Sequence, residues 1–156
     1  MSLLGPADQS RLRDEFAHLT RRVHLLFFTQ SLGCDTCLQT RQVLDELPPL
    51  SPQVVVDEVN FVLEADRAKQ YGIDRVPAIA VAYEPEGAVP AADGTAVPLT
   101  DTRIRFLGTP AGYEFISLVQ AVLLAGGGGS NLSASSLRRL SAVDRPMTMQ
   151  VFTTPT

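Results

Sequence analysis

The stretch VHLLFFTQSLGCDTC, from Val23 to Cys37, decides the fold of this chain. Its first six residues are almost all apolar, which predicts a central strand covered on both faces. A short loop then leads to Cys34 and Cys37, the only cysteines among the 156 residues. Apolar residues at helical spacing predict a helix from Cys34 to Leu47, with Cys37 turned inward and Cys34 at the exposed first turn. Two thiols that follow a buried strand at a helix start favour a reversible dithiol–disulfide pair.

The positions of the two cysteines predict different roles for them. Only a thiolate attacks a disulfide, so the attacking cysteine needs a lowered pKa and access to its partner. The first helical turn supplies unpaired N–H groups and the positive end of the helix dipole. The sequence therefore predicts Cys34 as the nucleophile and Cys37 as the thiol that resolves the mixed disulfide.

The two intervening residues, Asp35 and Thr36, are expected to tune the pair. When exposed, the carboxylate of Asp35 disfavours a neighbouring thiolate by about 1 kcal/mol or less. This effect makes the dithiol slightly more reducing than a neutral residue would.

Other uses of a close cysteine pair fit this sequence less well than redox chemistry. A structural zinc site needs about four ligands, and besides the two cysteines the chain offers His18 and His24 on other elements, so no metal is expected. A disulfide that spans two residues restrains the unfolded chain little, because that stabilisation grows with loop length. An inert buried pair remains the alternative.

Composition excludes several classes of partner. The net charge of −4 provides no basic surface for nucleic acid. No apolar stretch approaches the roughly 20 residues of a membrane span, and the N-terminus does not resemble a signal peptide. We therefore expect a cytoplasmic protein without nucleic-acid or membrane partners, in which a close cysteine pair indicates redox activity.

The rest of the chain predicts alternating helices and strands. We expect helices at 6–22, 64–71 and 113–125, and strands at 53–61, 78–83 and 103–107. Residues 84–102 are rich in Pro, Gly and Ala, with Asp93-Gly94 as a turn signal, and predict a long exposed hairpin loop. After the glycines at 126–129, a helix at 132–142 and a last strand at 147–156 are expected. This order predicts an α/β sandwich around a mixed sheet.

These features resemble the thioredoxin/glutaredoxin superfamily: a dithiol after a strand, Val76-Pro77 before a later strand, and Gly108 after the last one. The resemblance implies an α/β/α sandwich with a four-stranded mixed sheet, here with an extra N-terminal helix. In that superfamily the proline is cis and faces the dithiol, and the residue before it hydrogen-bonds the substrate. The resemblance therefore assigns Val76, Pro77 and Gly108 to substrate binding.

Two features depart from that superfamily. Thioredoxins carry a buried acid in the strand before the dithiol, whereas Phe28 and its neighbours are apolar. The Trp before the thioredoxin motif is replaced by Gly33, which we still place among the substrate-binding residues. These departures predict weaker catalysis rather than different chemistry.

A narrower resemblance covers nearly the whole chain. The N-terminal helix, GTPAGYEF at 108–115, and the segment 132–156 are similar to protein disulfide oxidoreductases with two tandem thioredoxin units, and to the related N-terminal domain of the alkyl hydroperoxide reductase flavoprotein. Within the chain, LFFT at 26–29 is echoed by QVFT at 150–153. We therefore expect a thioredoxin-like domain at 1–125, a glycine-rich linker and short helix at 126–147, and at 148–156 the first strand of a second unit whose Cys-x-x-Cys would follow Thr156.

The predicted function is thiol–disulfide oxidoreduction with protein disulfides, as a reductant or electron relay in the cell's redox homeostasis. No cofactor beyond the redox-active disulfide is expected. The resemblance implies a flavoprotein of the thioredoxin reductase type, a peroxiredoxin and the second thioredoxin-like unit as partners. One alternative is a binding or docking module with little activity. Another is that the last strand drives association with a second chain, because an unpaired strand edge invites pairing.

Overall fold

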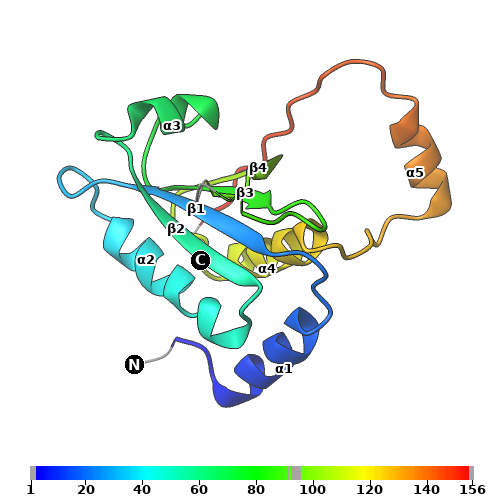
Figure 1. Cartoon of the computed structure of the whole chain (residues 1–156), viewed down its shortest axis with the longest axis horizontal. Coiled ribbons are helices and arrows are strands. Elements are labelled where there is room, and N and C mark those ends of the chain that lie inside the picture. Colours follow the sequence, from blue (N-terminus) through cyan, green and yellow to red (C-terminus); the bar gives the residue numbers. More distant parts are fainter. Residues whose placement is uncertain (1–2, 91, 93–95, 155–156) are drawn as a thin grey trace.

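The computed structural model describes residues 3–90, 92 and 96–154 of the chain. A single four-stranded sheet, in the order β2-β1-β3-β4, lies between helices on both faces (Figure 1). The elements are α1 (Pro6–Phe16), β1 (Val23–Thr29), α2 (Cys37–Asp45), the 3₁₀ turn η1 (Pro48–Leu50), β2 (Val54–Asn60), α3 (Ala65–Gln70), β3 (Ala78–Tyr83), β4 (Thr100–Leu107), α4 (Tyr113–Ala125) and α5 (Ala134–Ser141).

The central strand β1 pairs in parallel with β2 and antiparallel with β3, while β3 and β4 are antiparallel. Successive side chains of β1 enter two different cores. Leu25 and Phe27 pack in the larger core with α1, α2 and α4, and Leu26 and Phe28 pack in the smaller core beneath α3. The predicted mixed-sheet α/β sandwich with an extra N-terminal helix is confirmed.

The predicted first helix is wrong beyond Phe16. Residues 17–22 form a turn instead, and Leu19 is buried within it. The backbone N–H groups of Thr20 and Arg21 donate to the carbonyl of Gly126, at distances of 2.8 and 3.3 Å. This long-range pairing takes the place of helical hydrogen bonds, and helical spacing in the sequence does not reveal it.

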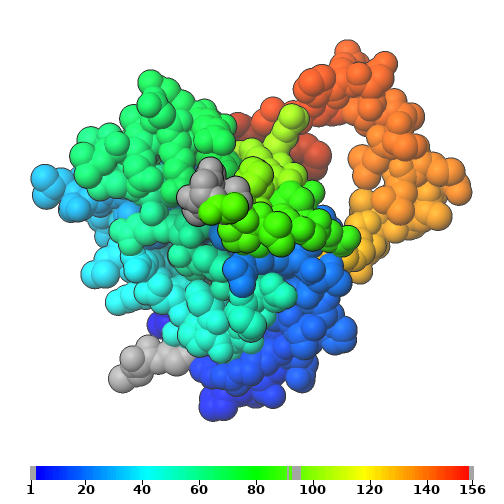
Figure 2. Space-filling view, in the orientation of Figure 1, coloured from blue at the N-terminus to red at the C-terminus, as the bar shows by residue number. Residues whose placement is uncertain are grey.

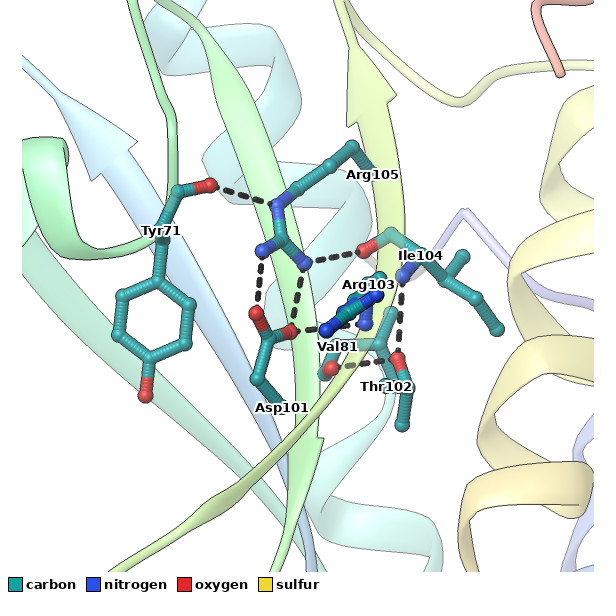
Figure 3. Close-up of polar contacts among 7 residues, drawn as sticks. All are labelled: Tyr71, Val81, Asp101, Thr102, Arg103, Ile104 and Arg105. Carbon is teal, nitrogen blue, oxygen red and sulfur yellow. Dashed lines mark hydrogen bonds and ion pairs between the residues drawn. The ribbon is translucent and has the colours of Figure 1, made fainter. Parts of the chain in front are cut away.

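The edge strand β4 begins at Thr100 and contains a bulge, where its register with β3 shifts between Ala80 and Ala82. Arg103 takes a left-handed φ of 64° there. Side chains hold the bulge in place, because the backbone N–H of Arg103 donates to Asp101 and the Thr102 hydroxyl donates to the Val81 carbonyl (Figure 3). A bulge of this kind bends an edge strand and increases its twist.

The chain beyond α4 leaves the body of the molecule and then returns to it. Helix α5 stands apart from the sheet, and the final segment runs back beside β4 (Figure 1). Figure 2 shows the same excursion as an open arc of atoms beside the compact body. Among the described residues, none after Gly126 is buried. The core therefore lies within the part of the chain that ends at Gly126, and the predicted domain boundaries stay a prediction.

The strand predicted at 147–156 is not formed: residues 147–154 have no regular secondary structure, and 155–156 lie outside the described residues. A strand needs a neighbour for its backbone hydrogen bonds, and this segment makes none with the sheet in the described part of the chain. Its side chains are open to solvent, with Met149 85% and Phe152 90% exposed. The predicted Asp93-Gly94 turn also falls outside the described residues. In the part of the chain that is described, no helix is long and apolar enough to cross a membrane.

Candidate redox site

Cys34 and Cys37 form a disulfide, with their Cα atoms 5.5 Å apart. Cys37 is 6% exposed, whereas Cys34 is half-buried, so the inward position predicted for Cys37 is confirmed. The predicted helix start is wrong, because α2 begins at Cys37, after the N-cap residue Thr36. Cys34 therefore lies in the loop before the helix. Its sulfur still reaches the positive N-terminal end of α2, because it is bonded to the first helical residue.

The loop before the disulfide is shaped by Gly33, which has a left-handed φ of 71°. The side-chain amide of Gln30 donates to the carbonyl of Gly33 over 3.4 Å. Asp35 and Thr36 are both exposed beside the sulfurs. The loop is thus closed on itself, and the residues predicted to tune the dithiol face the solvent.

The Val76–Pro77 segment lies beside the end of β1 that leads to the disulfide. Phe28 pairs with Ala78, which places Pro77 next to the last residue of β1. The Val76–Pro77 peptide bond is cis. Among the described residues, the backbone N–H and C=O of Val76 have no hydrogen-bond partner. These two groups are therefore available to an extended peptide at this edge.

Gly108 completes the same rim from β4. Its backbone N–H donates to the Pro77 carbonyl over 2.9 Å. Its φ is 105°, and a Cβ built on it would meet no atom within 4 Å. The space above Gly108 is therefore open, as close approach of a second polypeptide requires.

A pair of hydroxyls that the sequence did not point to holds α2 against this rim. The fully buried Thr40 hydroxyl donates to the Thr36 carbonyl over 2.9 Å and lies 2.8 Å from the Thr109 hydroxyl. A hydroxyl has one proton, so Thr109 is the donor between the two. Two signals were available in the sequence: Thr40 lies three residues after the inward Cys37 in the same predicted helix, and Thr109 directly follows Gly108.

His24 lies at the opposite end of β1 and takes no part in this site. Its Nδ1 is 2.5 Å from Asp57 and its Nε2 is 2.9 Å from Glu84. Burial lowers the pKa of His24, but hydrogen bonds and charge attraction from the two carboxylates outweigh it and raise that pKa above its ordinary value. The hydrogen bond from His24, opposed by burial, lowers the pKa of Asp57. Within the described ranges, no three His, Cys, Asp or Glu side chains form a group that could hold a metal.

Comparison with known proteins supports the fold. The chain matches the N-terminal domain of the alkyl hydroperoxide reductase AhpF from Enterococcus faecalis with a TM-score of 0.72 and 27% identity, over 91% of this chain and 62% of that one. A C503A mutant of the same reductase subunit matches with a TM-score of 0.70 and 27% identity, over 89% and 60% of the two chains. A protein disulfide oxidoreductase from Aeropyrum pernix matches with a TM-score of 0.66 and 20% identity, over 88% and 54%.

These matches show that the chain has the thioredoxin-like fold. The chain spans less than two thirds of the length of each of these structures. No protein-family model matches the chain. No curated protein matches it either.

The structure brings the predicted site residues together from three parts of the sheet. The loop after β1 carries Gly33, Cys34, Asp35 and Thr36, and Cys37 is the first residue of α2. The adjoining strand ends carry Val76, Pro77 and Gly108. Their roles in exchange with a partner remain predictions.

Proposed function

We propose that this chain is a thiol–disulfide oxidoreductase that exchanges its Cys34–Cys37 pair with disulfides of protein partners, as a reductant or electron relay. The observation that carries the proposal is the unequal burial of the two bonded cysteines. Cys37 is 6% exposed, and Cys34 is half-buried at a rim that ends in Val76-Pro77 and Gly108. One sulfur is therefore accessible to a partner and the other is held behind it.

The reaction proceeds through two thiol–disulfide exchanges, starting from the reduced pair. The Cys34 thiolate attacks one sulfur of the partner disulfide, forms a mixed disulfide and releases the other partner sulfur as a thiolate. The Cys37 thiolate then attacks the Cys34 sulfur, which forms the internal disulfide and releases the partner's remaining thiolate. Two electrons pass to the partner, whose two thiolates take up protons. A reductant of the flavoprotein reductase class would restore the dithiol.

The rim around the pair suits a protein partner better than a small molecule. The flanking side chains Leu32 and Leu38 are 85% and 72% exposed, and an exposed apolar surface favours protein contact. The unpaired backbone groups of Val76 would bond an extended peptide that carries the target disulfide.

The proposal is tested by measuring reduction of a protein disulfide such as that of insulin, with dithiothreitol as electron source. Cys34→Ser is expected to lose the activity, because it removes the attacking thiolate. Cys37→Ser is expected to accumulate a mixed disulfide with the substrate, because its resolving thiol is gone. An inactive unsubstituted chain, or Cys34→Ser with full activity, would refute the proposal.

A second candidate function is a binding or docking module of a larger redox protein. Two observations favour this alternative. The β1 residues Leu26 to Phe28 include no acid that could transfer protons at the dithiol. The structures that the chain resembles are also longer than the chain itself. Under this alternative, Cys37→Ser traps no substrate, and the chain binds its second unit or a peroxiredoxin equally well with Cys34 and Cys37 both replaced by Ser. We further propose the cytoplasm as the location, where a glutathione-buffered pool keeps such a pair in exchange.

A further inference from the structure

The outer edge of β4 is open where it approaches the redox site. In the sheet order β2-β1-β3-β4, β4 has a strand neighbour on one side. Gly108 donates to the Pro77 carbonyl, so these two residues face each other as a hydrogen-bonded pair. Hydrogen-bonded and non-hydrogen-bonded pairs alternate along an antiparallel ladder. In the observed register, Phe106 and Ile79 therefore form the next hydrogen-bonded pair.

The β4 residues between these hydrogen-bonded pairs have backbone groups that point away from β3. Leu107 faces Ala78 and Arg105 faces Ala80 as non-bonded pairs, so their N–H and C=O groups point away from β3. Among the described residues, no hydrogen bond reaches these backbone groups from outside the sheet. A short, regular and unpaired edge therefore runs from Arg105 to Leu107.

The Arg105 side chain does not block this edge. Its guanidinium donates to the Tyr71 carbonyl over 2.9 Å and makes a bidentate pair with the Asp101 carboxylate, at 2.8 and 2.6 Å (Figure 3). These bonds hold the side chain on the face of the sheet where Tyr71 lies. The bulge at Arg103 interrupts the regular edge of β4, so a docking strand would end there.

The C-terminal segment of the same chain lies at this edge. A groove of about 630 Å³ is lined both by Arg75, residues 105–107 and the first turns of α4, and by residues 149–153. The segment 147–153, MTMQVFT, has no charge and no proline, and includes Val and Phe, which favour strands. It has the composition of a strand and lies beside an unpaired one.

We propose that the open edge of β4 at Arg105–Leu107 is a docking site for an extended polypeptide, and that its occupant is residues 149–153 of this same chain, which add to the sheet as a fifth strand. Tethering favours the chain's own segment over a second copy, because a tethered segment has an effective concentration on the order of millimolar. The docked strand would flank Arg75 and Leu107, each next to the rim formed by Val76-Pro77 and Gly108.

Amide hydrogen exchange on the full-length chain, resolved by residue with NMR, tests this proposal. Because alternate N–H groups of a docked strand point at β4, one of the adjacent variants Gln150→Pro and Val151→Pro must remove a docking hydrogen bond. That variant is expected to increase the amide exchange rates of Arg105 and Leu107 by about tenfold or more. The other variant is expected to increase them by less. Phe106, which is bonded to β3, should exchange at an unchanged rate. Asn131→Pro, in the linker, is the control and should leave all three amides unchanged.

Both substituted residues are exposed in an irregular segment, so the fold should survive, and far-ultraviolet circular dichroism checks this. Equal exchange at Arg105 and Leu107 in the unsubstituted chain and in both segment variants would overturn the proposal. Protection of these amides that grows with protein concentration would also overturn it, because the occupant would then be a second copy.

Discussion

Thr40 and Thr109 connect the start of the cysteine helix with the chain after β4 through a pair of hydroxyls. The Thr40 hydroxyl accepts a hydrogen bond from the Thr109 hydroxyl and donates one to the Thr36 carbonyl. Thr40 is fully buried, so these two bonds satisfy its proton and one of its lone pairs without water. This linkage holds α2, and with it Cys37, against the loop that follows Gly108. Positioning of the dithiol thus depends on neutral side chains as well as on the backbone.

Replacement of Thr40 by Val is expected to lower the free energy of unfolding by about 1–2 kcal/mol, because both of its hydrogen bonds are lost at constant shape. Thr109→Val should cost less, about 0.5–1 kcal/mol, because Thr40 keeps its bond to Thr36. Urea unfolding of the oxidised chain measures both values. A larger loss for Thr109→Val than for Thr40→Val would contradict the donor assignment.

Gly33 is the second residue on which the loop geometry depends. Its φ of 71° lies in the left-handed region, where a side chain costs about 1–2 kcal/mol. Gly33→Ala is therefore expected to destabilise the oxidised chain by about 1 kcal/mol in thermal or urea unfolding. Gly129→Ala is the control, because Gly129 does not have a left-handed φ and a Cβ built on it would meet no atom within 4 Å. An equal effect in both variants would rule out backbone strain as the cause.

At the scale of elements, His24 joins three neighbouring segments at the end of the sheet away from the disulfide. It lies on β1, Asp57 lies on β2, and Glu84 directly follows β3. Because the folded-state pKa of His24 is raised, the protonated form is favoured in the folded protein. Its contribution to stability is fully present below the unfolded pKa of about 6.5 and is lost as the pH rises through the higher folded value.

His24→Gln is therefore expected to lose more stability at pH 5.5 than at pH 8.5, by a difference on the order of 1 kcal/mol. Unfolding free energies of both proteins at the two pH values give this difference directly. Asp57, whose pKa is lowered, acts in the other direction, and its contribution disappears as the pH falls below about 4. A loss for His24→Gln that is the same at both pH values would show that the pKa of His24 does not differ between the folded and unfolded proteins.

At the scale of the whole molecule, the stable body and the C-terminal excursion are distinct. The described core residues end at Ala125 and Gly126, and the apolar side chains of α5 and the final segment are exposed. Thr20 and Arg21 bond to the Gly126 carbonyl, which closes the body at that point. The C-terminal segment is expected to act on the edge of β4 and not on the core.

Removal of residues 130–156 is therefore expected to leave a single cooperative unfolding transition, with a denaturant m-value that falls by no more than the surface of one docked strand, because m follows the surface buried on folding. Equilibrium unfolding in urea, followed by circular dichroism, compares the shortened and full-length chains. A larger fall in m would mean that the segment after Gly126 belongs to the cooperative core.

Much of the architecture follows from the sequence. The bounds of β3 and α4 agree with the predicted ones, and the apolar run of β1 is buried on both faces. The inward turn of Cys37 follows from helical spacing. These features depend on local patterns of apolar residues and on the chain breaks between them, which neighbouring residues specify.

What the tertiary structure decided depends on partners far away in the chain. The chain does not continue α1 beyond Phe16, and the amides of Thr20 and Arg21 bond to Gly126 instead. Helix α2 starts at Cys37 rather than at Cys34. The contact of Thr109 with Thr40 spans 69 positions, and the segment predicted as a final strand has no paired neighbour in the described part of the chain. The sequence by itself determined a buried strand that leads to a dithiol. The packing of the sheet decided which groups surround that dithiol, because backbone and hydroxyl partners are set by spatial proximity that no local pattern contains.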